Sequence, residues 1–151
     1  MAPRPLQDDL TLVLSIVAHV SRETLEHHLA EMRLGVREHV VLNVIEAGAP
    51  TQLAIATRAG LDKSTLLPVL DRLESQQLIE RRPDPSDRRA RVITLTPAGR
   101  RALDKSSRRV TSIESDLLTD LDPEEQAQFR SFLRRIVEGR MSTLSVPGSC
   151  L

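Results

Sequence analysis

The chain has 151 residues, of which 40% are hydrophobic, and its 21 basic side chains balance 21 acidic ones. This length suits one compact domain or one protomer of an intertwined dimer. It contains no apolar run of membrane-spanning length and no signal-peptide core, and its single cysteine, Cys150, excludes an intrachain disulfide or a cysteine-rich zinc cluster.

Two helices are predicted in the first third of the chain. From about Leu6 to Arg33, apolar residues recur three and four positions apart, as on one face of a helix. We expect Gly35 to end this helix in the left-handed conformation. A second helix is expected from about Arg37 to Ala47, without a Ser, Thr or Asp N-cap, and the sequence Gly-Ala-Pro at 48–50 ends it.

Two shorter helices follow, capped by Thr51 and Asp62 and separated by a corner at 60–61. Leu53 and the alanines after it are expected to pack the first of them closely against its neighbours. On the second, an apolar face lies opposite a polar one: Leu66, Val69, Leu70 and Leu73 against Ser64, Pro68, Asp71 and Ser75. Thr65 and Arg72 lie on one flank between these faces, and Leu67 lies on the other.

Pro68 is unusual within this helix pattern. An interior proline removes a backbone hydrogen bond, here to the Ser64 carbonyl, and typically costs about 3 kcal/mol. We expect a kink that tilts the N-terminal end of the helix outward; the alternative is a helix that begins later.

A hairpin and two further helices complete the predicted elements. The strands are expected at 78–82 and 91–95, with Pro83 and Pro85 keeping the loop out of the ladder. Thr96-Pro97 and Asp122-Pro123 each place a capping side chain before a proline at the first helical position. The helices that they open are predicted to end near residues 119 and 139.

Charge is separated along the chain. Residues 58–109 hold 13 Lys and Arg against 7 Asp and Glu, whereas the remainder holds 8 against 14. The basic segment coincides with the two short helices and the hairpin, an arrangement typical of a winged helix-turn-helix that binds duplex DNA.

The fourth helix fits this function. An α-helix enters the major groove, where Lys63, Ser64 and Thr65 would reach bases or phosphates and Leu67 a thymine methyl. Ser64 and Thr65 are also ordinary first-turn capping residues, and Arg72 has an alternative as a partner in an ion pair along the helix surface.

The hairpin loop carries the more specific signal. Arg88, Arg89 and Arg91 cluster there, and Asp87 can hold one guanidinium in place. An arginine on such a loop can enter the minor groove, where narrow A·T tracts deepen the negative potential.

The segment LIERRPDPSDRRARVITLTPAG closely resembles the wing signature of MarR-type winged-helix regulators, and KSTLLPVLDRLESQQLI resembles their recognition helix. The resemblance implies major-groove reading by Ser64, Thr65 and nearby exposed residues, and a minor-groove role for Arg89 supported by Asp87. It also implies a dimer interface built from the first, fifth and sixth helices, and small effectors or oxidants acting in the cleft between the lobes.

Two features depart from the family pattern. Gln77 stands where a glycine commonly ends the recognition helix. Leu67 and Pro68 replace polar and basic residues; the proline is similar to the hydroperoxide-sensing branch, but the first helix lacks that branch's cysteine. We therefore do not expect a thiol mechanism.

Other kinds of site are weakly supported. His19, Glu23 and His27 are spaced four apart, with His28 adjacent and His39 on the second helix, which could bind Zn²⁺ or an anionic effector. Helical periodicity often produces such alignments by chance, so we interpret this stripe as a polar helix face. Because there is no GxSxG, P-loop or HExxH motif, we expect no enzyme and no cofactor.

The predicted protein is mostly α with a small β-wing. Residues 1–34 and 100–141 would form dimerisation helices, 36–99 the winged helix-turn-helix, and 142–151 a flexible tail. We expect a cytoplasmic, homodimeric, ligand-responsive repressor that binds a pseudo-palindromic operator in double-stranded DNA and not a membrane. The alternatives are a winged-helix module for protein contacts alone, or a metal-responsive regulator that uses the first-helix histidines.

Overall fold

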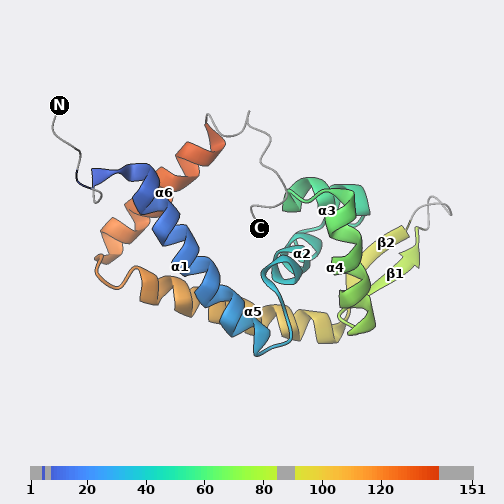
Figure 1. The fold of residues 1–151 in the computed structure, drawn as a ribbon. Helices are drawn as coiled ribbons and strands as arrows, with labels where there is room; N and C mark the ends of the chain where they lie inside the picture. The colour runs from blue at the N-terminus through green and yellow to red at the C-terminus, as the bar shows by residue number, and fades with distance from the viewer. Residues whose placement is uncertain (1–4, 6–7, 85–90, 140–151) are drawn as a thin grey trace.

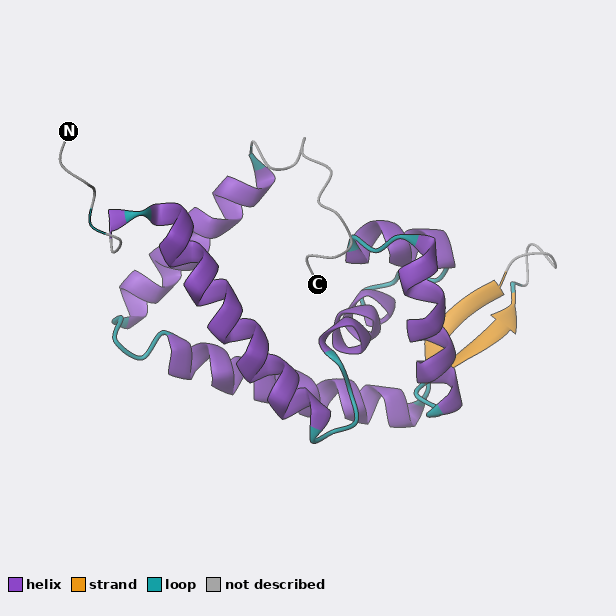
Figure 2. Cartoon of the chain, in the orientation of Figure 1, coloured by secondary structure: helices purple, strands orange, loops and turns teal. Residues whose placement is uncertain are grey.

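The computed structural model describes residues 5, 8–84 and 91–139, and in these it forms six helices and one antiparallel hairpin (Figures 1 and 2). The predicted fold class, mostly α with a small β-wing, is confirmed. In chain order the elements are α1 (Leu10–Ala30), α2 (Val36–Glu46), α3 (Gln52–Ala59), α4 (Lys63–Ser75), β1 (Ile79–Pro83), β2 (Arg91–Leu95), α5 (Pro97–Leu117) and α6 (Pro123–Glu138).

The helix starts follow the predicted local chemistry. The side chains of Thr51, Asp62, Thr96 and Asp122 each accept a hydrogen bond from a first-turn backbone N–H. α1 begins at Leu10, where Asp9 accepts from two backbone N–H groups, and the predicted start at Leu6 lies outside the described residues. α4 begins at Lys63 and continues through Pro68, so the alternative of a later start is wrong.

The connection between α1 and α2 differs from the prediction. Arg33, and not Gly35, adopts the left-handed conformation, with a φ of 58°. Gly35 is extended and is the N-cap of α2, which has no side-chain cap, as expected. A Cβ at Gly35 would meet the Glu38 carboxylate, so in this arrangement the absence of a side chain leaves room for the end of the Glu38 side chain.

The hairpin forms the wing. Its register pairs Ile79 with Leu95 and Pro83 with Arg91, so Pro83 is the last residue of β1 rather than outside the ladder. A proline is tolerated at this terminal position because few ladder bonds depend on its missing N–H. The backbone N–H of Ile93 also donates to the Pro50 carbonyl at 2.8 Å, which fixes β2 against the loop before α3.

The buried core lies in the part of the molecule that contains α2, α3, α4, the hairpin and the start of α5. Leu42, Ile55 and Leu70 at its centre are fully buried. α1 and α6 extend away from this lobe (Figure 1), and much of their apolar surface is exposed. Among the described residues, no helix is both long and apolar enough to cross a membrane.

Candidate nucleic-acid interface

The N-terminus of α4 is organised by Asp62. Its carboxylate accepts hydrogen bonds from the Ser64 hydroxyl at 2.6 Å, the Thr65 backbone N–H at 2.8 Å and the Thr65 hydroxyl at 3.0 Å. These bonds, led by that from Ser64, lower the pKa of Asp62 to about 2. Both hydroxyls that were predicted to read DNA therefore donate to the capping carboxylate here, while remaining at the exposed end of the helix.

The predicted division of α4 into two faces is confirmed. Leu66, Val69, Leu70 and Leu73 are buried, and Ser64, Pro68, Asp71 and Ser75 are exposed. The exposed face therefore presents short polar groups and one proline, and packing against the lobe fixes its orientation.

A cleft of about 450 Å³ lies between α3 and the first half of α4. Lys63 and Leu67 line it from α4, and Arg91 lines it from the start of β2. Leu53 also lines it and is 78% exposed, so the expectation that Leu53 packs closely against neighbours is wrong. This exposure was not predictable from the sequence, because Leu53 fits an apolar helix pattern. The cleft brings cationic and apolar side chains together beside the exposed face of α4.

Arg72 contacts α2 instead of a partner along α4. Its Nη1 atom lies 3.5 Å from Oε1 of Glu38, whose side chain is 9% exposed. One turn later, Gln76 Nε2 donates to the Arg33 carbonyl at 3.3 Å. These contacts fasten the second half of α4 to the junction between α1 and α2.

The wing is fastened to α4 by Arg81, which the sequence analysis did not single out. Its guanidinium contacts Asp71 at 2.6 Å and Glu74 at 3.1 Å, both on α4. Arg91 is exposed at the start of β2. The other predicted wing residues, Asp87, Arg88 and Arg89, lie outside the described residues.

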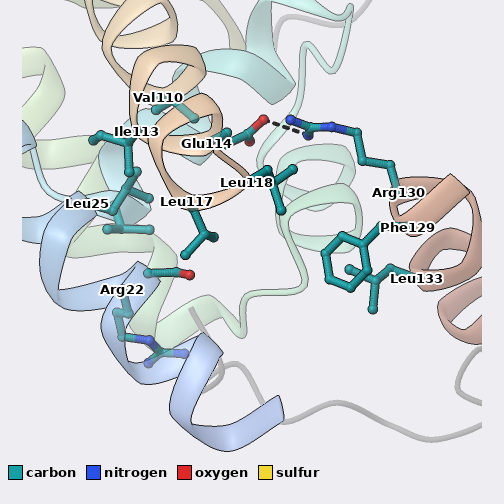
Figure 3. A pocket seen from close by; sticks show the side chains of 12 residues that line it. Arg22, Leu25, Val110, Ile113, Glu114, Leu117, Leu118, Phe129, Arg130 and Leu133 are labelled. Carbon is teal, nitrogen blue, oxygen red and sulfur yellow. Dashed lines mark hydrogen bonds and ion pairs between the residues drawn. The ribbon is translucent and has the colours of Figure 1, made fainter. Parts of the chain in front are cut away.

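A separate apolar pocket of about 360 Å³ lies where α1, α5 and α6 meet (Figure 3). Leu25, Ile113 and Leu117 line one side, and Phe129 and Leu133 face them from α6. The polar side chains that line it include Arg22 and an ion pair in which Arg130 Nη1 lies 2.7 Å from Glu114 Oε2. Such a lining suits a small, largely apolar molecule with a few polar groups.

Comparison with known proteins places these features in a family. The MarR family model matches residues 37–90. CouR from Rhodococcus jostii RHA1, solved bound to p-coumaroyl-CoA, is 31% identical, with 89% of this chain and 95% of CouR covered and a TM-score of 0.76. A MarR family transcriptional regulator from Rhodococcus sp. RHA1 is 29% identical over 89% of this chain and 96% of its own, with a TM-score of 0.77. The transcriptional regulator HosA from Escherichia coli O111:H- is 29% identical over 126 residues, which are 79% of this chain and 93% of HosA.

The chain belongs to the MarR family. It is a MarR family transcriptional regulator, and both HosA and the protein from Rhodococcus sp. RHA1 are described as transcriptional regulators.

Gln77 illustrates how this MarR family member departs from the family pattern. Its φ is 59°, so it occupies the left-handed conformation that glycine adopts without strain. α4 is therefore followed by a positive-φ residue that is not glycine, at the position where the family commonly has one.

The histidines of the chain are divided among different surroundings. His19 contacts Glu23 at 3.5 Å, but the possible ligand atoms that lie together among the described residues belong to His27, His28 and Glu31. The predicted set of His19, Glu23 and His27 does not form such a group there. Arg109 Nη2 also lies 2.7 Å from His28 Nδ1, and a guanidinium beside this nitrogen opposes metal binding.

His39 lies on α2 and is buried where this helix contacts α5. Ser106 donates its hydroxyl proton to the Leu103 carbonyl at 3.0 Å, so its oxygen accepts from His39 Nδ1 at 2.8 Å. Nε2 then accepts from the Asn43 amide at 3.0 Å. This network holds His39 neutral, and burial lowers its pKa from the ordinary value of 6.5. His39 is therefore a structural residue.

Proposed function

We propose that the chain is a homodimeric, ligand-responsive repressor that binds a pseudo-palindromic operator in double-stranded DNA, acting in the cytoplasm. The observation that carries the proposal is the cleft at the start of α4. There, Lys63 and Arg91 rim a surface that also includes the apolar Leu67. The exposed face of α4 would enter the major groove, with Ser64 and Thr65 exchanging Asp62 for bases or phosphates.

The wing would complete each half-site. Arg91 leads from the described part of the wing to the segment that carries Asp87, Arg88 and Arg89. We assign Arg89 to the minor groove, supported by Asp87, as the family resemblance implies. The contact of Arg81 with Asp71 and Glu74 would set the distance between the wing and the recognition helix.

Dimerisation is supported by the exposed apolar surfaces of α1 and α6. Leu10, Ile16 and Val20 on α1 are 66%, 54% and 48% exposed. Ile136 and Val137 on α6 are 53% and 60% exposed. Patches of this kind mark protein contacts. We therefore assign residues 1–34 and 100–141 to dimerisation and residues 36–99 to DNA binding.

The apolar pocket at α1, α5 and α6 is the proposed effector site. It lies among the helices assigned to dimerisation, so an occupant could favour one spacing of the two DNA-binding lobes over another. The binding of p-coumaroyl-CoA by CouR supports a ligand-responsive role.

A salt titration tests the DNA-binding proposal. We expect affinity for a duplex to fall steeply as the salt concentration rises, because cationic side chains release counterions from the DNA.

A substitution tests the wing. Arg89→Ala should weaken binding and leave the dimer intact, whereas Arg134→Ala, which removes an equal charge from α6, should not weaken it. Unchanged binding by Arg89→Ala in a gel-shift assay would refute the wing role. A flat salt response would favour the alternative winged-helix module that contacts only proteins.

A further inference from the structure

A basic groove lies between α1 and α5, apart from the sites described above. Its volume is about 580 Å³. Lys105, Arg108, Arg109 and Ser112 line it from α5, His28 lines it from α1, and Glu31 lines it from the turn after α1. It shares no lining residue with the cleft beside α4 or with the apolar pocket. It is therefore a distinct site.

The α5 residues of the groove share one side of the helix, because they are spaced three or four positions apart. Lys105 and Arg108 are exposed, and neither has a hydrogen-bond or ion-pair partner among the residues that the structure describes. Arg101, one turn before Lys105, is exposed in the same way. This surface thus presents cations that the fold itself does not neutralise.

Arg109 is held across the groove by a histidine. Its Nη2 atom lies 2.7 Å from His28 Nδ1 and 3.0 Å from Nε2. Because both distances are short at once, Nη2 lies against the face of the imidazole ring rather than along the lone pair of one nitrogen. The contact orients Arg109 while leaving other N–H donors of its guanidinium for a ligand.

The carboxylate that lines the groove does not cancel these charges. Glu31 lies 3.9 Å from His28 Nδ1 and 3.8 Å from His27 Nε2. Lys105, Arg108 and Arg109 therefore outweigh it by two charges. A ligand with about two negative charges would balance this excess, as a phosphate group does near neutral pH.

We propose that this groove binds the phosphate group of a small phosphorylated compound. The two guanidinium groups would contact phosphate oxygens in pairs, Lys105 would add a point charge, and the Ser112 hydroxyl would donate a further hydrogen bond. The volume is within the range of small-molecule sites. DNA can supply the same chemistry through its backbone, so the experiment separates these two sources.

The test uses the full-length chain with pyrophosphate as the probe, in isothermal titration calorimetry. Lys105→Gln combined with Arg108→Gln should weaken pyrophosphate binding about a hundredfold, because each of the two charged hydrogen-bonding groups contributes about tenfold in affinity. Both residues are exposed and unpartnered in the described structure, so the fold should persist. The matched control, Arg134→Gln combined with Arg135→Gln, removes two exposed charges from α6 and should bind as the unmodified chain does.

Three results would overturn the proposal: no pyrophosphate binding by the unmodified chain, equal binding by the groove variant, or equal weakening in the α6 control. A duplex-binding arm separates the sources of phosphate. If a small compound is the ligand, the groove variant keeps its duplex affinity and salt dependence. If both decrease, DNA is the source and the small-compound proposal is wrong. The calorimetric result does not depend on the proposed repressor function.

Discussion

The winged-helix lobe buries most of its apolar side chains, whereas helices α1 and α6 leave many of theirs exposed. In the lobe, Leu42, Ile55 and Leu70 have no exposed surface, and one cluster connects α2, α3, α4 and the hairpin. α6 has no buried residue, and Leu29 is the only one in α1. The lobe is thus stabilised by contacts within its own chain, whereas the two helices leave apolar area that a second chain could cover. In the proposed dimer, the lobe would therefore depend on contacts within one chain, and α1 and α6 on contacts between two chains.

The largest expected effect comes from charging the exposed apolar face. Ile16→Glu combined with Ile136→Glu should produce a monomer, because a dimer would bury both carboxylates. Operator affinity should then fall by about a hundredfold or more, since two half-sites no longer bind together. Light scattering after size-exclusion chromatography gives the mass. Leu53→Glu, at a still more exposed apolar position in the lobe, is the control and should leave the mass unchanged. A dimer of the double variant would contradict the comparison.

A core truncation tests the other half of the comparison. Leu70→Ala should lower the free energy of unfolding by about 2–5 kcal/mol, because it leaves a cavity at a fully buried position. Urea titrations at two protein concentrations give the measurement. We expect Leu70→Ala to lower the free energy of unfolding by the same amount at both concentrations. The decrease caused by Ile136→Ala should instead change with protein concentration.

The buried histidine network should contribute less. Ser106→Ala leaves the Nδ1–H of His39 without its acceptor and should cost about 1–3 kcal/mol. Ser107→Ala, at the neighbouring half-buried position, is the control. A loss no greater than that of the control would show that His39 finds another partner.

The same network predicts a dependence on pH. Because the pKa of His39 is lowered in the folded chain, the unfolded chain binds its proton more readily. The contribution is therefore complete above pH 6.5 and is lost as pH falls toward the folded pKa. Urea midpoints between pH 5 and pH 8 should show this decrease, and His39→Gln should remove part of it.

The smallest effect concerns a single backbone conformation. Gln77→Gly should stabilise the lobe by about 1 kcal/mol, because glycine adopts a positive φ without steric strain. Gly60→Ala, at a φ of 64°, should destabilise it by a similar amount. Thermal unfolding of both variants provides the comparison, and a destabilised Gln77→Gly protein would contradict it.

These elements also show how far the sequence could be interpreted. The caps at Thr51, Asp62, Thr96 and Asp122 were predictable, because each depends on residues within one turn. The two faces of α4 followed from helical periodicity for the same reason. The left-handed residue was placed at Gly35 instead of Arg33, because composition favours glycine whereas the packing of the α1–α2 turn decides the backbone.

Contacts between distant parts of the chain were harder to predict from the sequence. The Arg72–Glu38 pair and the contacts of Arg81 join different elements. The periodicity of helices and strands does not predict which elements lie close together in space. The exposure of Leu53 also depends on where α3 packs. The positive segment from 58 to 109 did indicate the lobe that holds the cleft beside α4, although the wing-tip roles of Arg88 and Arg89 stay predictions.

The attachment of α4 to the α1–α2 junction has a mechanical consequence. Arg72 and Gln76 join the same end of α4 to Glu38 and to the Arg33 carbonyl, and Gly35 lets Glu38 fold back into that contact. The last turns of α4 are therefore joined by polar contacts to the segment that links α1 to the lobe, while its first turns are held by the buried Leu66 and Leu70. A change in the position of α1 would thus meet α4 at the end opposite Lys63.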